Sequence, residues 1–272
     1  MIIEKTWPGV NRAAGENMEE LIPYLIVCPL IFLGGFVDSI AGGGGLITLP
    51  AYLIAGLPAH FAIGTNKISS AMGTSLTTWK FWKQGYIKPK LSLLCVVFAL
   101  AGSTLGANLA LLVSDRYFKI ILLIILPLTA LYVFKSKAME TGGKEPLSPG
   151  KTAIIAAAAA FVIGAYDGFY GPGTGTFLLL ILTGLARMDL NSAAGTTKVI
   201  NLSTGLAALV TYLINGKIDF MLGFVAGIFG IAGNWLGTRC FTQNGAKIVK
   251  PIIFVVLAIF FVRILWEMFT GA

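Results

Sequence analysis

Two polar interruptions of long apolar segments hold the side chains that could do chemistry. The first, with the segment that follows it, contributes Asp38, Gly42–Gly45 and Lys67. The second contributes Asp167, Gly171–Gly175 and Lys198. An acid, a run of glycines and a lysine are each unfavourable in a helix or in hydrocarbon. A chain that keeps this combination twice indicates that the combination has a function.

The glycines favour an anion site. Glycine-rich turns expose backbone N–H groups that bind anions, and a helix that starts at the turn adds its positive end. The alternative is close helix packing, which is how we interpret Gly102 with Gly106 and Gly233 with Gly237. The motif at Gly171–Gly175 is not a dinucleotide fingerprint, because no strand precedes it.

The two lysines are the second element of this predicted site. Each would cost roughly 2.5–3.5 kcal/mol at the centre of a membrane helix, unless it extends to the surface. Both have polar neighbours, and Ser70 and Asn201 follow them by three residues on the same helix face. We expect a small anion to be bound by Gly42, Gly43, Gly44, Gly45, Thr65, Asn66, Lys67, Ser70, Gly171, Gly173, Thr174, Gly175, Thr196, Lys198 and Asn201.

Asp38 and Asp167 are the carboxylates nearest to the interruptions. A desolvated aspartate could carry a proton and couple transport to it. It could instead pair permanently with a lysine or cap the following turn. The sequence leaves these roles open, and both residues are coupling candidates.

Composition predicts an all-α polytopic membrane protein. Of 272 residues, 56% are hydrophobic and 12% are charged, against roughly 25% charged residues in soluble domains. The net charge of +8 fits the positive-inside rule for membrane proteins, so nucleic acid is not an expected partner. Three cysteines without metal spacing, and the absence of a catalytic triad or cofactor motif, predict no enzyme, no metal and no cofactor.

The elements that must position the site follow from the apolar runs. We expect a polar N-terminal segment at 1–20, a first repeat at 21–136, a linker at 137–150 and a second repeat at 151–272. Within each repeat, a break beginning at the aspartate precedes a short helix of about 15 Å, too short to cross hydrocarbon alone. We expect eight to ten membrane segments, including these two short broken or re-entrant helices.

The two halves align with each other. Asp38 falls on Asp167 at an offset of 129, and Lys67 falls on Lys198 at an offset of 131. This register predicts two homologous repeats, as in many transporters. Whether the repeats are inverted or parallel stays open, because the Lys and Arg distribution fits both arrangements. Alternating access favours inversion.

The paired motifs resemble the sulfite exporter TauE/SafE family of membrane permeases, over nearly the whole chain after residue 20. The Gly-Pro-Gly-Thr-Gly wording at 171–175 is similar to a subgroup whose substrates are mostly unassigned. The resemblance implies a secondary transporter of the bacterial inner membrane that moves sulfite, sulfonates or related sulfur-containing organic anions. The partners would be the lipid bilayer and the anion. A passive anion channel is the alternative, and a homodimer is left open.

Overall fold

The computed structural model describes residues 14–114 and 145–241, and positions 117, 120, 121, 124 and 128 between them. Helices are the only regular elements in the described ranges. They are α1 (Ala14–Ala41), α2 (Gly45–Ile54), α3 (Ala59–Lys83), α4 (Pro89–Leu111), α6 (Pro149–Phe169), α7 (Thr174–Gly184), α8 (Leu190–Ile214) and α9 (Phe220–Arg239). The apolar runs also predict spans at 117–134 and 248–269; only the five single positions of the first are described, and the second lies outside the described residues.

The all-α membrane class is confirmed. Within the described residues, five helices are long and apolar enough to cross a membrane, namely α4, α6, α8, α9 and the Leu21–Ile40 part of α1. Large apolar side chains such as Leu93, Ile154 and Phe220 are exposed, which suits a surface facing lipid. The total of eight to ten membrane segments stays a prediction.

The helix breaks come one turn later than predicted. We expected breaks to begin at Asp38 and Asp167, but α1 continues to Ala41 and α6 continues to Phe169. No helix breaker stands between Asp38 and Gly42, and Gly168, which follows Asp167, remains within α6. Each helix stops before a glycine with positive φ, Gly42 at 75° and Gly171 at 99°, a conformation that costs other residues roughly 1–2 kcal/mol. Both aspartates therefore sit in the last helical turns. Helix α1 also begins inside the segment predicted to be a separate polar N-terminus.

Each short helix turns back along the long helix before it. Thr48 of α2 lies against Gly34 of α1. In the second half, the Phe177 ring of α7 meets the Tyr166 ring of α6 with 5.4 Å between centroids. Each break is therefore the bend of a hairpin.

The corresponding helices of the two halves run in opposite directions. The Thr78 hydroxyl of α3 donates to the Lys198 carbonyl of α8, while Gly64 at the other end of α3 lies beside Tyr212 of α8. Helices α3 and α8 are thus antiparallel. By the same kind of contact, α1, α3 and α9 share one direction and α4, α6 and α8 share the other.

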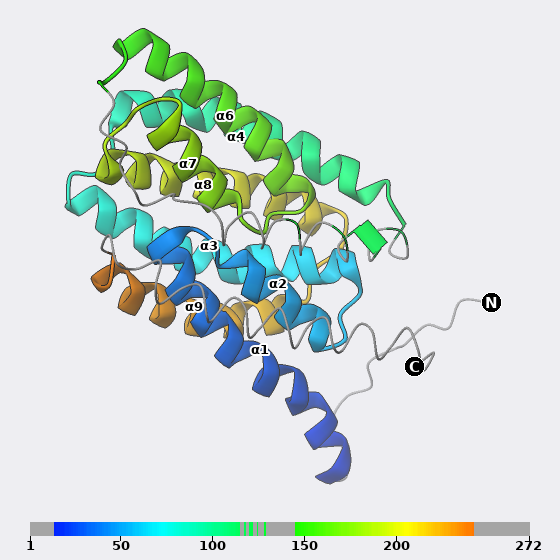
Figure 1. The fold of residues 1–272 in the computed structure, drawn as a ribbon. Helices are drawn as coiled ribbons and strands as arrows, with labels where there is room; N and C mark the ends of the chain where they lie inside the picture. Colours follow the sequence, from blue (N-terminus) through cyan, green and yellow to red (C-terminus); the bar gives the residue numbers. More distant parts are fainter. Residues whose placement is uncertain are drawn as a thin grey trace.

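The packing units are not the two halves of the sequence. Figure 1 shows one bundle of α1, α2, α3 and α9 and a second bundle of α4, α6, α7 and α8. Helix α4 joins the second-half helices, because Gly102 and Gly106 lie against the α6 backbone at Phe161 and Ala165. Helix α9 joins the first-half helices through Gly233 and Gly237 in the same way. The predicted packing role of these four glycines is confirmed.

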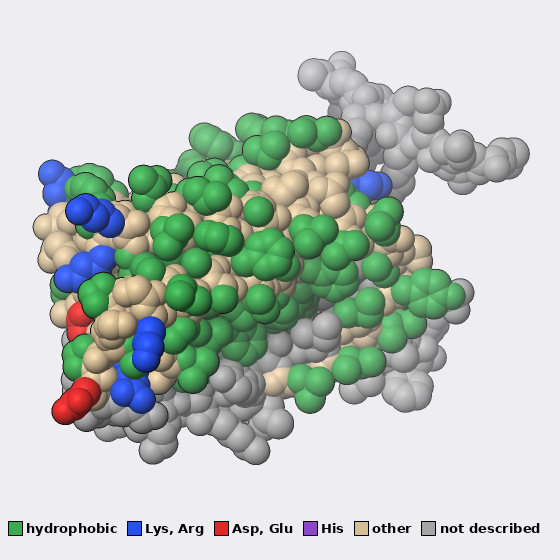
Figure 2. Space-filling view, turned by 90° about the horizontal axis from the view of Figure 1, so that it is seen from above, with side chains coloured by type: hydrophobic (Ala, Val, Ile, Leu, Met, Phe, Trp, Pro, Cys, Tyr) green, Lys and Arg blue, Asp and Glu red, His purple; other side chains and the backbone are tan. Residues whose placement is uncertain are grey.

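One end of the molecule is basic. On the face seen in Figure 2, apolar side chains cover the middle and Lys and Arg side chains gather at one end. The turns and helix ends there carry Lys80, Lys83, Lys88, Lys90, Lys151, Arg187 and Arg239. We call this the basic end. The opposite end holds the α2–α3 and α8–α9 turns, with Lys217 in the latter.

Candidate functional site

The two glycine breaks meet at the interface between the bundles. A Cβ atom added to Gly42 would lie 2.5 Å from the Gly175 carbonyl carbon, and one added to Gly45 would lie 2.8 Å from Pro172 Cα. Only glycine permits so close an approach of two backbones. In this conformation the breaks touch directly, with no room for an anion between Gly42 and Gly175.

Lys67 is paired with Asp167 across the bundle interface. Its Nζ atom donates to Asp167 Oδ2 at 3.0 Å and to the Asp167 carbonyl at 2.7 Å. The lysine comes from α3 and the aspartate from the last turn of α6, so each bundle contributes one partner. The lysine side chain is only 5% exposed, and it does not extend to the membrane surface.

Lys198 makes the reciprocal pair with Asp38. Its Nζ atom donates to Asp38 Oδ2 and to the Asp38 carbonyl, both at 2.6 Å. Here α8 of one bundle supplies the lysine and α1 of the other supplies the aspartate. Of the roles that the sequence left open for the aspartates, pairing with a lysine is the one present in this conformation.

The two pairs lie toward opposite ends of the molecule. Lys198 is eight residues after Leu190 at the basic end of α8, roughly 12 Å along the axis. Lys67 is eight residues after Ala59 at the opposite end of α3. Thr78, which contacts Lys198, is eleven residues beyond Lys67, roughly 16 Å along α3. Each lysine therefore belongs to its own pair, and the two do not converge on one point.

The other predicted binding residues divide into two groups. Thr65 lies outside the centre, because its hydroxyl accepts a hydrogen bond from the Asp219 N–H in the α8–α9 turn. Thr196 is fully buried, and its hydroxyl has no hydrogen-bond partner in the described stretches. The Oδ1 atoms of Asn66 and Asn201 are also buried there without a partner. Unpaired buried polar atoms are costly, so these are candidates for a ligand or for water.

Two cavities adjoin Asp38. The first has a volume of about 30 Å³ and also contacts Thr48, Ser70, Thr74 and Asn234. The second, of about 10 Å³, lies between Asp38, Lys198 and the rings of Phe81 and Phe241. Of the polar residues in the larger cavity, our sequence prediction included only Asp38 and Ser70. Ser70 and Thr74 are one helical turn apart on α3, and this spacing could have added Thr74 to the predicted site.

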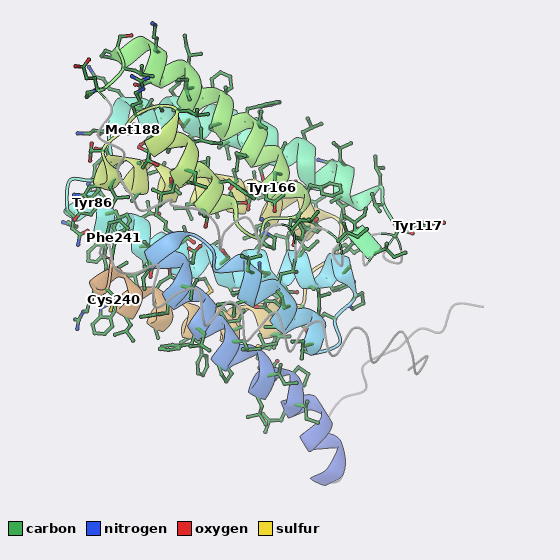
Figure 3. The ribbon with its side chains drawn as sticks, in the orientation of Figure 1. Tyr86, Tyr117, Tyr166, Met188, Cys240 and Phe241 are labelled. Atoms are coloured by element: carbon green, nitrogen blue, oxygen red, sulfur yellow. The ribbon has the colours of Figure 1, made fainter. Side chains whose placement is uncertain are left out.

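Aromatic side chains surround both pairs. Figure 3 shows Tyr166 near the second break, where its hydroxyl donates to the Pro172 carbonyl at 2.7 Å. Tyr86 and Phe241 lie toward the basic end in the same view, and both rings pack against Phe81. The sequence predicts that Tyr86 belongs to an interfacial aromatic belt and assigns no role to the other rings.

The start of α8 at the basic end is fixed by Asp189. Its carboxylate accepts a hydrogen bond from the Ser192 N–H at 2.9 Å, as an N-cap does. Burial by itself raises the pKa of the Asp189 carboxyl. The hydrogen bonds from Ser192 and the nearby Lys88 charge outweigh that effect and hold this pKa below its ordinary value.

Known proteins resemble the chain over most of its length. A probable membrane transporter protein of Sinorhizobium sp. is 35% identical over 90% of this chain and 92% of its own length. One from Haemophilus influenzae is 32% identical over 82% of this chain and 86% of its own length. The Escherichia coli probable membrane transporter protein YfcA is 30% identical, with coverage of 92% and 95%. No solved structure gives a significant match.

The family assignment rests on the segment that contains both pairs. The family model described as sulfite exporter TauE/SafE matches residues 27–264. This range includes both glycine breaks, both lysines and both aspartates. The chain belongs to the sulfite exporter TauE/SafE family of membrane proteins.

Proposed function

We propose that this membrane transporter carries small oxyanions or sulfonates by alternating access, and that the two Lys–Asp pairs are its gates. The observation that carries the proposal is the reciprocal pairing. Each lysine is bound by an aspartate of the other bundle, and one pair lies toward each end. Opening either end of the bundle interface separates one pair and leaves the other closed.

The chemistry of each gate suits an anion substrate. A buried ammonium group without a counter-charge is strongly unfavourable, so a lysine released from its aspartate needs another anion. The carboxylate of Asp38 or Asp167 occupies the place that a substrate oxyanion would take. The N-termini of α2 and α7 add the positive ends of their helix dipoles. Exchange of the aspartate for the substrate keeps the site neutral.

The arrangement of the helices supports the same mechanism. We propose that the two sequence halves are an inverted duplication, because corresponding helices run in opposite directions. An inverted duplication yields two related gates that face opposite sides of a membrane. The moving units would be the two bundles, each of which contains one helix from the other half. This differs from simple rocking of one sequence half against the other.

Charge suggests the orientation. Seven of the described Lys and Arg residues lie at the basic end, and cytoplasmic ends of membrane proteins carry such an excess. We propose that the basic end faces the cytoplasm of a bacterial cell, in the inner membrane. The Lys198–Asp38 pair is then the cytoplasmic gate, and the Lys67–Asp167 pair is the external gate.

The substrate class comes from the family. The family is described as sulfite exporters, so sulfite, sulfonates and related sulfur-containing anions are the first compounds to test. Coupling to protons is our proposed energy source, since each gate contains a carboxylate that a proton could neutralise.

The test is anion binding and exchange by purified protein. Thermal unfolding is measured with sulfite, sulfate, thiosulfate and small sulfonates, and the best anion is used for counterflow in liposomes. Lys67→Ala and Lys198→Ala are expected to abolish stabilisation by the anion. Lys83→Ala, an exposed lysine on α3, is expected to retain it. Unchanged stabilisation in both gate variants contradicts the proposed site, and single-channel current steps indicate a passive channel instead.

A further inference from the structure

The two gates differ in how many hydrogen-bond donors reach the carboxylate oxygens. In the Lys67–Asp167 pair, Asp167 Oδ2 binds the lysine, and the Thr174 hydroxyl lies 3.0 Å from Asp167 Oδ1. The single proton of this hydroxyl is shared with the Gly171 carbonyl at 2.6 Å. Both carboxylate oxygens therefore have a donor within reach. Lys67 and Thr174 therefore contact the Asp167 carboxylate from two sides.

Asp38 lacks the second donor. With the halves aligned at an offset of 129, Thr174 corresponds to Gly45, which has no side chain to donate. A larger residue does not fit, because a Cβ atom at Gly45 would lie 2.8 Å from Pro172 Cα. Within the described stretches no hydrogen bond reaches Asp38 Oδ1. The Asp38 side chain is 18% exposed, against 11% for Asp167.

A polar cavity takes the place of the missing donor. Its volume of about 30 Å³ exceeds the roughly 10–15 Å³ that a buried water requires, and such a water needs two to four polar partners. The hydroxyls of Thr48 and Thr74 line this cavity, both residues are buried, and neither hydroxyl bonds to another described residue. Ser70, also in the lining, is exposed, so the cavity is not sealed.

The aligned positions in the second half do not repeat this lining. The residues aligned with Thr48, Ser69 and Thr74 are Phe177, Ile200 and Gly205. Three hydroxyl-bearing residues beside Asp38 are thus replaced by three residues without a hydroxyl around Asp167. Ser70 and Asn234 have polar counterparts in Asn201 and Ser103, so the two gates differ at these three hydroxyl positions.

The charges around the cavity indicate which cation can reach Asp38 through it. Helices α1, α2, α3, α7, α8 and α9 contribute to the two cavities beside Asp38, and Lys198 is the only other charged or titratable side chain in their linings. The start of α2 at Gly44 and Gly45 adds a positive dipole end. A metal cation would be repelled by both. A proton that binds the carboxylate needs neither the volume nor the additional ligands that a metal cation requires.

We infer that Asp38, and not Asp167, takes up and releases a proton during transport, through water in the cavity lined by Thr48, Ser70 and Thr74. A hydronium ion in the cavity gives its proton to Asp38 Oδ1 and becomes water, and only O–H bonds form or break. Lys198 stays an ammonium ion and loses its counter-charge. The anion then binds Lys198, and the proton returns to water when Asp38 pairs with Lys198 again. For a monovalent anion the cycle moves one positive and one negative charge and is electroneutral.

Proton uptake can be measured apart from transport. Infrared difference spectra of the protein in lipid nanodiscs, taken across a pH series without any anion substrate, report the carbonyl stretch of a protonated carboxyl group. The wild type and Asp167→Asn are expected to share a titrating band that Asp38→Asn lacks. A band that survives Asp38→Asn, a band lost only in Asp167→Asn, or a wild type without the band overturns the inference.

Milder variants cover the case in which Asp38→Asn does not fold. Thr48→Val and Thr74→Val keep the carboxylate and remove hydroxyls from the cavity, and both are expected to slow the appearance of the band after a pH jump. The matched control is Thr183→Val, whose hydroxyl bonds to the Leu179 carbonyl within α7. Equal rates in all three variants contradict the proposed water path. The series is repeated in Na⁺ and in K⁺, and a band that depends on Na⁺ assigns a metal cation to the cavity instead.

Only the role of the Asp38 proton in transport rests on the proposed function. Proton uptake by Asp38 can be tested without it. In liposomes, Asp38→Asn is expected to lose the stimulation of anion transport by an imposed pH gradient. If no anion is transported by the wild type, the proposed function fails while the infrared result stands. If anions are transported and Asp38→Asn still responds to the pH gradient, the inference alone fails.

Discussion

The Lys67–Asp167 and Lys198–Asp38 pairs are built from the same two residue types and the same two hydrogen bonds, yet their surroundings differ. Asp167 has a second donor in Thr174, whereas Asp38 has Gly45 and a polar cavity at the corresponding place. The charged residues alone do not distinguish the gates. Neighbouring positions, one hydroxyl present or absent, decide whether the second oxygen of the carboxylate has a donor within reach or adjoins a cavity.

The largest expected effect separates the two lysines. Lys67→Ala leaves Asp167 buried and unpaired, which should lower the free energy of unfolding by roughly 3–5 kcal/mol. Lys198→Ala should cost clearly less, because Asp38 can take a proton from its cavity and become neutral. The measurement is the unfolding midpoint of the purified protein in detergent, with Lys83→Ala as the control. Equal losses for both lysines would remove the distinction between the gates.

The contact between the breaks gives a second test. Gly42 and Gly85 both have positive φ, at 75° and 74°, but only Gly42 faces another backbone, while Gly85 faces open space. Gly85→Ala should therefore cost only the backbone strain, roughly 1–2 kcal/mol. Gly42→Ala should cost about 1–3 kcal/mol more, because the breaks must separate. Similar unfolding midpoints for the two variants would mean that the breaks are not in contact.

The third test concerns the single hydroxyl that distinguishes the pairs. Thr174→Val removes a hydrogen bond to the Asp167 carboxylate, worth roughly 1.5–3 kcal/mol of stability. Thr48→Val removes a hydroxyl without a partner in the described part of the chain, so its effect on unfolding should be much smaller. Chemical denaturation of both variants compares the two losses. A larger loss for Thr48→Val would reverse the roles that we assign to the two residues.

The smallest expected effect lies at the helix starts. Asp189 caps α8, whereas the corresponding residue before α3 is Pro58, which makes no side-chain cap. Asp189→Ala should cost about 1 kcal/mol. Because its pKa is lowered in the folded state, this contribution is present above the ordinary aspartate pKa and is lost as the pH falls through the folded value. The difference between wild type and variant should therefore shrink in acid. A difference that stays constant with pH would argue against an ionised cap.

Much of the fold was readable from local patterns. Apolar runs predicted the membrane helices, and the two glycine runs predicted two breaks with a short helix after each. The positions of the breaks were wrong by about one turn. Ser39, Ile40 and Ala41 do not stop a helix, and the sequence pattern could not show that α1 continues as far as the residue before Gly42. Gly102, Gly106, Gly233 and Gly237 were correctly interpreted as packing residues, but their partner helices were not predictable.

The candidate site was predictable in part. Lys67, Lys198, Asp38 and Asp167 were singled out because charge inside an apolar segment is costly. Thr48, Thr74 and Asn234 were missed, because a lone threonine or asparagine in a membrane helix costs little and carries no signal until its neighbours are known. Thr174 was predicted to bind substrate, and the structure gives it a hydrogen bond to Asp167. A substrate role for the predicted residues stays a prediction.

The sequence by itself determined that the helices lie in a lipid bilayer, that two of them are broken, and which buried charged residues need a partner. Hydropathy and glycine conformation act locally, so these features can be read from short segments. Only the tertiary structure decided which lysine meets which aspartate. Lys67 and Asp167 are 100 residues apart, and Lys198 and Asp38 are 160 apart. Each pair joins helices of opposite halves, α3 with α6 and α8 with α1, so it forms only where the two bundles meet in the folded chain.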